Sequence, residues 1–473
     1  MPKYSKVIYW SRRDFRITDN TALCEAAKSG DQVIPVYIIS QWKDTHRWTG
    51  TNRQSFLCSS LDAFAKNLET IGGQLIFRQG AAVDELVRLI GETKADAIFY
   101  NRDPDPHGKH VQELLAEECA KLGVDVVGFK DAVLHEADEV RTKTGGPYRV
   151  FTPFGRNWSL LEKPAPRGKP GKLNTPSNIK SSKPPSLRTW KLSQATATII
   201  EPGERAARKR MNDALTGPLM NYGAIRDIPF GQTTSRLSQD LRFGLISIRE
   251  LYAKTLAASA AAGDAGIRDN YTKFITELGW REFYMAVLEQ WPDVLEVEFN
   301  PAWRGLAWEQ SDERLERFIS GETGFPIVDA GVRELLGTGF MHNRVRMIVA
   351  MFLTKDLRIN WRAGEQFFMK HLVDGEIASN NGGWQWSAGV GADAAPYFRI
   401  QNPWTQTKRY DPDGEYIKQW VPELRDVDPR QFSKPPAAGE RIASDYPTPM
   451  VDHSEERQRT LEWFAKHKDK NSS

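Results

Sequence analysis

The chain has 473 residues, enough for two or three domains with buried cores. Its net charge of +3 excludes a polybasic tail protein but leaves a nucleic-acid site open, because phosphate binding depends on local clustering of Lys and Arg. Its three cysteines form no C-x-x-C pair, which argues against disulfides and structural zinc, so we expect a protein of the reducing cytoplasm.

The first part of the chain alternates between short apolar runs and helical patterns. Strands are predicted at 7–10, 33–39, 74–77, 97–100 and 124–129, and helices at 19–28, 52–70, 82–93 and 107–122. This alternation predicts a five-stranded, doubly wound parallel sheet of Rossmann-like type, in which ligands sit at the carboxyl ends of the strands. Those ends carry SRRDFR (11–16) and NRDPDP (101–106), and no G-x-G-x-x-G follows the first strand. The pattern argues against a dinucleotide here and leaves two alternatives, a smaller polar ligand or solvated loops.

The rest of the chain reads as a connector followed by helices. Residues 162–188 are rich in Pro, Ser, Gly and Lys and cannot bury a core, which is typical of a linker. Helical patterns then run through 204–215, 235–255, 269–291, 311–320, 326–337, 342–356 and 361–373. The apolar run MIVAMFL (347–353) is too short to span a bilayer, and the N-terminus lacks a signal core. We therefore predict an α/β domain at 1–131, an interdomain linker at 132–200 and an all-α domain at 201–473.

Two motifs in the helical part bring polar groups together. TTSRLS (233–238) places hydroxyls at the start of a predicted helix, where they can cap free backbone N–H groups or help to bind a phosphate. ELGWREFY (277–284) gathers Glu277, Trp280, Arg281 and Tyr284 on one helix face. That face suits a flat polar ring, and a buried aromatic face with a surface ion pair is the alternative.

MHNRVRM (341–347) begins another predicted helix, in which Asn343, Arg346 and Met347 share a face. Residues 341–362 hold five basic residues and one acidic residue, an excess that suits nucleic-acid contact or an ordinary solvated surface. His342 has no metal-like partners nearby in the sequence, and we interpret it as structural.

DGEIASNNGGWQW (374–386) combines acids, amides, glycines and two indoles. Asp374 and Glu376 flank a turn glycine, and the Asn and Gly residues predict a loosened helix. Residues two apart point in nearly opposite directions on a helix or a strand, so Trp384 and Trp386 should face different surroundings.

Taken together, these segments resemble the photolyase/cryptochrome family, and specifically the class I cyclobutane pyrimidine dimer photolyases. The resemblance runs through SRRDFRITDN, FTPFGRNW, TSRLS, WREFY, MHNRVRM, KDLRINWRAGE, NNGGWQW and DAAPYFRIQNP, nearly the whole chain. It implies FAD in the helical domain and repair of DNA by light-driven electron transfer to a flipped-out dimer. No metal is expected, and the protein is expected to be a monomer.

The resemblance assigns cofactor contacts residue by residue. The residues implied to contact FAD are Tyr222, Thr234, Ser235, Arg236, Leu237, Ser238, Phe274, Arg346, Asp374, Gly375, Glu376 and Asn380. Arg346 and Asp374 would form an ion pair beside the isoalloxazine, and Asn380 would face its N5. Glu376 is a departure, because class I enzymes usually carry D-G-D at this point.

The resemblance also assigns an electron route and a DNA surface. Trp384, Trp361 and Trp308 match the family's tryptophan chain to oxidised flavin. Trp280 and Trp386 would wall the lesion, with Glu277 and Asn343 bonding base edges and Met347 between them. The contacts to flanking DNA would be Arg226, Arg281, Arg344 and Gln406.

The resemblance also gives an indication of the type of DNA lesion and of the type of antenna chromophore. In (6-4) photolyases, histidines occupy the positions of Asn343 and Met347, so cyclobutane dimers are favoured here. Folate-type members carry an Asn-Glu pair near 103–110, where this chain has His107 and Gly108, which favours a deazaflavin or flavin antenna. The alternatives are a cryptochrome-like blue-light photoreceptor and a flavin-bearing nucleic-acid-binding protein without repair activity.

Overall fold

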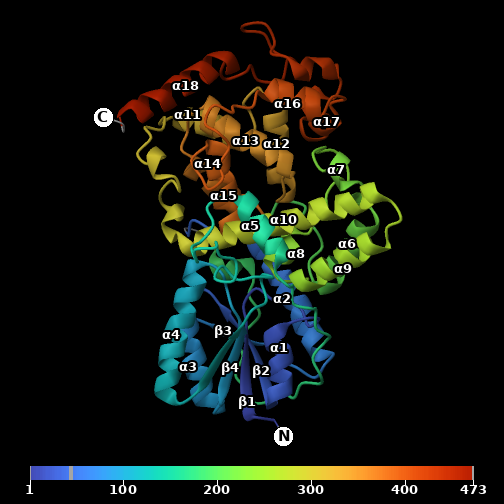
Figure 1. Cartoon of the computed structure of the whole chain (residues 1–473), viewed down its shortest axis with the longest axis vertical. Helices are drawn as coiled ribbons and strands as arrows, with labels where there is room; N and C mark the ends of the chain where they lie inside the picture. Colours follow the sequence, from blue (N-terminus) through green and yellow to red (C-terminus); the bar gives the residue numbers. More distant parts are fainter. Residues whose placement is uncertain (1, 42–45, 471–473) are drawn as a thin grey trace. The chain divides into compact units, whose positions relative to one another are not determined.

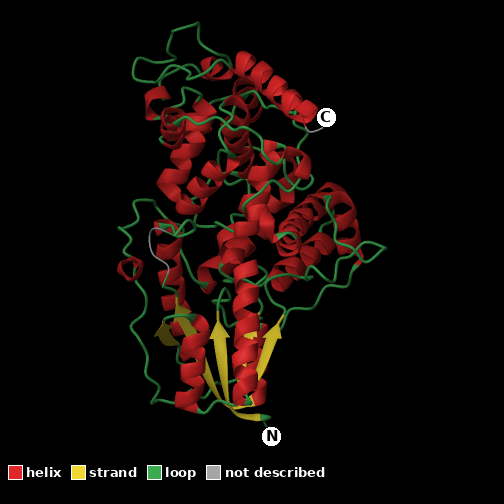
Figure 2. Cartoon of the chain, turned by 90° about the vertical axis from the view of Figure 1, so that its left-hand side faces the viewer, coloured by secondary structure: helices red, strands yellow, loops and turns green. Residues whose placement is uncertain are grey.

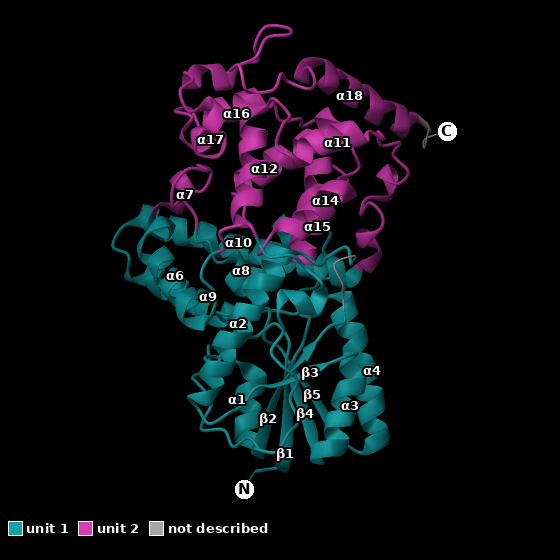
Figure 3. Cartoon of the chain, turned by 180° about the vertical axis from the view of Figure 1, so that it is seen from behind, with its two compact units in different colours: residues 1–195, 200–220, 235–290 teal, residues 196–199, 221–234, 291–473 magenta. Residues whose placement is uncertain are grey.

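The structure, a computed structural model, describes residues 2–41 and 46–470. The chain divides into two compact units (Figure 3). Unit 1 comprises residues 1–195, 200–220 and 235–290, and unit 2 comprises residues 196–199, 221–234 and 291–473. Each unit is built around its own set of elements.

A five-stranded parallel sheet forms the centre of the N-terminal part of unit 1, which confirms the predicted fold class (Figures 1 and 2). The strands are β1 (Tyr4–Ser11), β2 (Gly30–Ile39), β3 (Ile76–Gln79), β4 (Ala97–Asn101) and β5 (Asp125–Phe129). Their order in the sheet is β3-β2-β1-β4-β5. On the central strand, Val7 pairs with Val33 on one side and Ala97 on the other, and all three are buried. Apolar side chains fit here because helices cover both faces of such a sheet.

Four helices connect these strands: α1 (Thr21–Ser29), α2 (Thr51–Glu69), α3 (Ala82–Thr93) and α4 (Pro106–Leu122). Two of these helices begin at residues whose side chains cap the free backbone N–H groups of the first turn. The Asn20 side chain accepts a hydrogen bond from the Leu23 N–H at the start of α1, and Asp105 does the same for Gly108 at the start of α4. Residues 162–186 form no helix or strand, in keeping with their composition.

The remaining elements of the first part are α5 (Phe151–Leu160), η1 (Leu187–Trp190), α6 (Glu204–Thr216), η2 (Pro218–Asn221), α8 (Ser238–Arg242), α9 (Ile248–Ala261) and α10 (Ala265–Gln290). The single helix predicted at 235–255 is wrong, because α8 and α9 are separate. Gly244 separates them with a φ of +59°, and a Cβ there would lie 2.1 Å from the carbonyl oxygen of Arg13. This close approach to the loop after β1 ends the first helix.

Unit 2 is helical. Its elements are α7 (Tyr222–Ile225), η3 (Pro292–Leu295), η4 (Pro301–Trp303), α11 (Asp312–Ile319), α12 (Pro326–Thr338), α13 (Asn343–Met351), the π-helix η5 (Phe352–Asp356), α14 (Trp361–His371), α15 (Ile377–Ala388), α16 (Pro403–Tyr410), α17 (Glu415–Trp420), η6 (Pro422–Leu424), η7 (Pro429–Ser433) and α18 (His453–Lys470). Its core joins side chains from α11 to α18. No helix in the described part of the chain is long and apolar enough to cross a membrane.

The loosened helix predicted around NNGGWQW is also wrong, because α15 is continuous. Its amide side chains do not compete with their own backbone. Asn381 and Gln385 instead donate hydrogen bonds to the carbonyl oxygen of Val294, at 3.1 and 2.8 Å. Tertiary partners therefore override the weak helix propensity of this segment.

Candidate functional site

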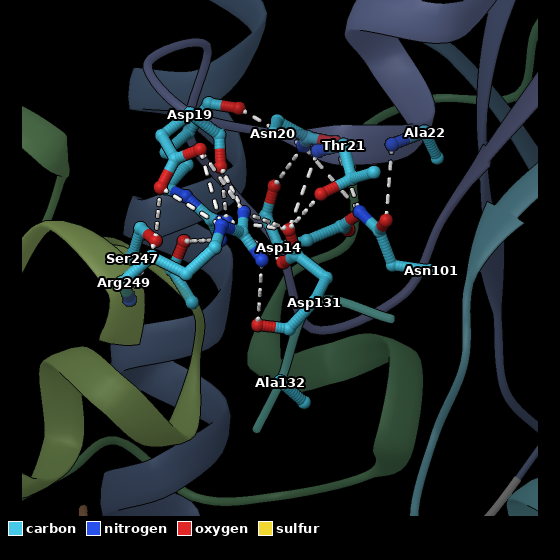
Figure 4. A network of polar contacts seen from close by, with 12 residues as sticks. Asp14, Asp19, Asn20, Thr21, Ala22, Asn101, Asp131, Ala132, Ser247 and Arg249 are labelled. Atoms are coloured by element: carbon cyan, nitrogen blue, oxygen red, sulfur yellow. Dashed lines mark hydrogen bonds and ion pairs between the residues drawn. The ribbon is translucent and has the colours of Figure 1, made fainter. Parts of the chain in front are cut away.

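The polar segments at the carboxyl ends of the strands form a buried network (Figure 4). Asp131 accepts hydrogen bonds from Arg16 and Arg249, each at 2.7 Å, and the Asn101 amide donates to Asp14 at 2.6 Å. Burial alone would raise the pKa of Asp131, but the two guanidinium groups lower it to about 2. The solvated-loop alternative for 11–16 and 101–106 is therefore wrong for these side chains, which join the sheet to the start of α9.

The face predicted on α10 is present. Trp280 stacks on Phe151 with ring centroids 3.7 Å apart and planes 11° apart, and Arg281 donates to the carbonyl oxygen of Ala132 at 2.9 Å. Glu277 is half-buried, and Phe274, one turn earlier, is buried. Trp280 thus has one ring face covered by protein, as a wall for a flat ligand would need.

Sequence reasoning missed the neighbouring Glu282. This carboxylate is 2% exposed, and it accepts hydrogen bonds from the His135 N–H at 3.1 Å and from the Trp158 Nε1–H at 2.7 Å. Burial raises its pKa. Glu282 holds α10 against α5 and the loop after β5, and only the fold brings its partners to it.

The capping interpretation of TTSRLS is wrong. Helix α8 begins at Ser238, and its N-cap is Leu237, which supplies no side-chain hydrogen bond. Arg236 has a left-handed φ of 52°, and its carbonyl oxygen accepts from the Gln239 amide at 2.6 Å. This turn, rather than a hydroxyl, orders the helix start, and the predicted FAD contacts at Thr234, Ser235, Arg236, Leu237 and Ser238 stay predictions.

Most of the basic side chains at 341–362 are paired with acids, namely Arg344, Arg346 and Arg358. Arg344 Nη2 lies 2.8 Å from Asp227 Oδ1, and its guanidinium lies 4.7 Å from the ring centre of Tyr410. Arg358 forms ion pairs with Glu456 and Glu309. The basic excess at 341–362 is therefore largely balanced by acids from distant segments. His342 caps α13 by accepting from the Arg344 N–H at 3.2 Å, which confirms its structural role.

The remaining residues assigned to DNA lie on three helices of unit 2. Arg226 and Tyr222 share α7, with the guanidinium 5.6 Å from the Tyr222 ring centre. Asn343 is exposed at the first turn of α13, and Met347, one turn later, is half-buried. Gln406 is half-buried on α16.

The residues assigned to the flavin ring meet around the start of α15. Arg346 Nη2 lies 2.8 Å from Asp374 Oδ2, so the predicted ion pair is present. The other carboxylate oxygen, Asp374 Oδ1, is buried and has no hydrogen-bond partner among the described residues. Asn380 donates to the carbonyl oxygen of Glu365 at 3.0 Å, which fixes its orientation. A Cβ built on Gly383, one turn after Asn380, would meet nothing within 4 Å. This helix face therefore has open space beside it.

Gly375 and Glu376 lead into this helix. Gly375 is buried, and Glu376 is the half-buried N-cap residue of α15 without a side-chain cap. The longer Glu376 side chain is thus accommodated at the position of the family's usual aspartate.

The two indoles of NNGGWQW face different surroundings, as predicted. Trp384 is 2% exposed and packs on Phe368, with ring centroids 4.9 Å apart, whereas Trp386 is half-buried. A Cβ at Gly364 would lie 2.0 Å from the Trp384 ring, so this glycine gives the indole its place. The sequence did not indicate a role for Gly364, because the Trp384 indole that lies against it belongs to another helix.

Trp361 and Trp308 lie in the same core as Trp384. Trp361 is one turn before Gly364 on α14, and Gly364 lies against the Trp384 indole. Its Nε1–H donates to Glu298 Oε1 at 3.2 Å, a second partner that the sequence did not indicate. Trp308 is half-buried at the edge of this core.

Known protein families match both parts of the chain. Residues 7–170 match the family described as DNA photolyase, and residues 274–466 match the FAD binding domain of DNA photolyase. A deoxyribodipyrimidine photo-lyase of Agrobacterium fabrum is 38% identical over 98% of this chain and 98% of its own length. The boundaries predicted at 131 and 200 stay predictions.

Three solved structures share the fold. A class III photolyase from Agrobacterium tumefaciens superposes with a TM-score of 0.91 at 38% identity, covering 99% of both chains. An archaeal photolyase from Sulfolobus tokodaii, described with two FAD molecules, gives 0.83 at 30% identity, covering 98% of this chain and 100% of its own. A cryptochrome from Synechocystis sp. PCC6803 gives 0.86 at 28% identity, covering 97% and 98%. The class I expectation is not confirmed, because the first of these structures is described as class III. The chain belongs to the DNA photolyase family and carries its FAD-binding domain.

Proposed function

We propose that the protein repairs cyclobutane pyrimidine dimers in DNA by light-driven electron transfer from reduced FAD. The observation that carries the proposal is helix α15. It presents Asn380 beside open space, buries Trp384 in the core and leaves Trp386 half-buried. The near-full-length identity with deoxyribodipyrimidine photo-lyases supports the same chemistry.

The residues around the start of α15 fit FAD. The orphaned carboxylate oxygen of Asp374 needs a donor, which a ligand N–H or O–H supplies. The open side of α15 at Gly383 leaves room for a ring on the face of Asn380. The proposed FAD contacts are Tyr222, Thr234, Ser235, Arg236, Leu237, Ser238, Phe274, Arg346, Asp374, Gly375, Glu376 and Asn380. When bound and reduced, FAD supplies the electron that enters the dimer after it absorbs light.

The indoles of Trp384, Trp361 and Trp308 would return electrons to oxidised cofactor. The Trp384 Nε1–H is buried without a partner among the described residues, so a positive charge is poorly stabilised there. At Trp361 the Glu298 carboxylate would stabilise such a charge, and at the half-buried Trp308 partial exposure to solvent would do so. This order favours movement of the charge from the core outward.

The dimer and its flanking DNA would meet side chains already positioned by the protein. Phe151 holds the ring plane of Trp280, which leaves the indole ready to stack on a base. Glu277 and Asn343 supply hydrogen-bonding groups for base edges, with Met347 and Trp386 as apolar surfaces. Neither Asn343 nor Met347 is a histidine, which favours cyclobutane dimers over (6-4) products. Arg226, Arg281, Arg344 and Gln406 would contact the strand beside the lesion, so affinity should fall with salt.

We propose that the second, antenna chromophore is of flavin or deazaflavin type and not a folate. A Cβ built at Gly108 would lie 2.6 Å from Asp103 Cβ, so the glutamate of folate-type members does not fit at this position. A cavity of about 140 Å³ beside this segment is lined by Asp103, Lys109 and Glu289, and the Lys109–Glu289 ion pair of 2.6 Å borders it. This volume is below the roughly 300 Å³ of small ligand pockets, so this cavity does not support the antenna proposal. Mass spectrometry of extracted chromophores would identify any antenna.

The proposal is tested by illuminating the reduced, FAD-loaded protein with dimer-containing oligothymidylate and following the recovery of thymine absorbance. Repair predicts recovery in light and none in the dark. An absence of recovery with FAD fully reduced and bound would favour a cryptochrome-like photoreceptor. Binding of damaged DNA without recovery would favour a flavin-bearing nucleic-acid-binding protein.

A further inference from the structure

A tryptophan of the C-terminal helix lies against Trp308, at the outer end of the electron route. The ring centroids of Trp463 and Trp308 are 5.0 Å apart, with planes at 66°. The Trp463 Nε1–H donates to the carbonyl oxygen of Ala307 at 3.1 Å, which ties the indole to the residue preceding Trp308. Both rings are half-buried. The two π-systems are therefore in contact, and both reach solvent.

The position of Trp463 is set by buried contacts of helix α18. His453 Nδ1 lies 2.5 Å from Asp356 Oδ1, and Thr460 donates to the carbonyl oxygen of Lys355. Asp356 and Thr460 are each 0% exposed. Trp463 lies one turn after Thr460, so the helix that carries it is fixed to the π-helix η5. The contact with Trp308 is thus part of a packed core rather than of a loose terminus.

We propose that Trp463 is a redox-active residue that extends the electron route by one step beyond Trp308. This inference rests on the tryptophan chain of the proposed function. One electron passes from the Trp463 indole to the oxidised Trp308 indole, no bond forms or breaks, and the positive charge moves to Trp463. A thiolate in solution then returns one electron to Trp463 and becomes a thiyl radical.

The hydrogen bond to Ala307 favours the transfer of the electron from Trp463 to the oxidised Trp308. An indole that carries a positive charge is a stronger donor than a neutral one, so its N–H···O=C bond strengthens on oxidation. The added indole also moves the charge one residue further from the cofactor. Return of the electron from the reduced cofactor becomes slower, and the oxidised indole survives longer for the thiolate to reach it.

The test uses the FAD-loaded protein and two measurements. Transient absorption after a light pulse gives the lifetime of the oxidised tryptophan. Peptide mass spectrometry after illumination without reductant locates the oxidised residue. We expect oxidation at Trp463 in the unaltered protein. Trp463→Phe should move the product to Trp308 and shorten the lifetime about fivefold, the factor that corresponds to one ordinary hydrogen bond. Trp463→Tyr should restore part of the lifetime.

Trp420→Phe is the matched control, because Trp420 is a half-buried indole of the same core that stacks against Gly337 instead of Trp308. It should leave the lifetime and the oxidation map unchanged. An unoxidised Trp463 peptide, with an unchanged lifetime in Trp463→Phe, would overturn the inference. Trp384→Phe separates this from failure of the whole chain. If Trp384→Phe abolishes the radical while Trp463→Phe has no effect, the tryptophan chain stands and only the extension fails.

Discussion

Replacement of Gly364 by alanine tests the packing that positions Trp384. A Cβ at Gly364 would lie 2.0 Å from Cη2 and 2.3 Å from Cζ3 of the indole. Carbon atoms pack best about 3.5–4.0 Å apart, so the ring would have to move by roughly 1.5 Å. Trp384 is 2% exposed, and a dense core offers no space for such a shift.

Overpacking of this kind costs about 1–3 kcal/mol, whereas the higher helix propensity of alanine returns only about 1 kcal/mol. Since the clash is with a rigid ring, we expect a net loss of about 2 kcal/mol, which lowers the melting temperature by about 4–8 °C for a unit of this size. Thermal unfolding followed by circular dichroism measures the change.

Gly383→Ala is the matched control on the neighbouring helix, because its Cβ would meet nothing within 4 Å. In protein stripped of FAD it should raise stability by about 0.5–1 kcal/mol, as other unstrained Gly-to-Ala changes do. A Gly364→Ala variant as stable as Gly383→Ala would contradict this prediction, since the indole would then have room that the structure does not give it.

Three further predictions follow from buried charges and from the two indoles. Burial lowers the pKa of Lys355 from its ordinary 10.5 to about 7, so the unfolded chain binds more protons between these values and stability should rise from pH 7 to about 10. Lys355→Met should flatten this rise in urea midpoints, and an unchanged slope would exclude Lys355 as its source. Asp131→Asn removes the charge facing two buried guanidinium groups and should cost about 3–5 kcal/mol, so a variant with an unaltered melting temperature would contradict the network. Trp386→Ala should weaken binding of damaged DNA and leave photoreduction nearly intact, and Trp384→Phe should do the reverse. The same phenotype in both would mean that the indoles are not separated in function.

The sheet could be predicted because its inner strands, β1, β2 and β4, are largely buried and read as apolar runs. The error at β3 has a specific cause. The sequence predicted 74–77, but the strand extends over Ile76–Gln79 and includes Arg78. Its guanidinium lies 3.0 Å from Glu85 and 2.8 Å from Glu92. Arg78 is charged and is neutralised by acids of α3, so it does not extend the apolar run from which the strand was predicted. The predicted strand therefore ended too early.

The predictions of helix boundaries and caps were wrong where contacts with residues distant in the sequence determine the backbone conformation. Gly244 separates α8 from α9 because the chain passes against Arg13, far away in the sequence. Helix α15 persists because Asn381 and Gln385 find acceptors at Val294. Neither partner can be found from the local sequence pattern. For an isolated segment, that pattern correctly predicts that glycine lowers helix stability and that amide side chains compete for backbone hydrogen bonds.

For the candidate site, spacing predicted which side chains share a face, as on α10 and α13. It could not predict pairs between separate segments, such as Arg344 with Asp227 or Trp463 with Trp308. The roles toward flavin and DNA came from the family resemblance. The opposite orientations of Trp384 and Trp386 came from helix geometry alone, and their burial confirms them.

The most direct test of the central claim is chromatographic measurement of repaired thymines from two oligonucleotides, one with a single cyclobutane dimer and one with a single (6-4) product. Each is incubated with the reduced, FAD-loaded protein in blue light and in the dark. We expect restoration of the cyclobutane substrate only, and only in light. Restoration of the (6-4) substrate instead, or of neither substrate while FAD stays reduced and bound, would contradict it.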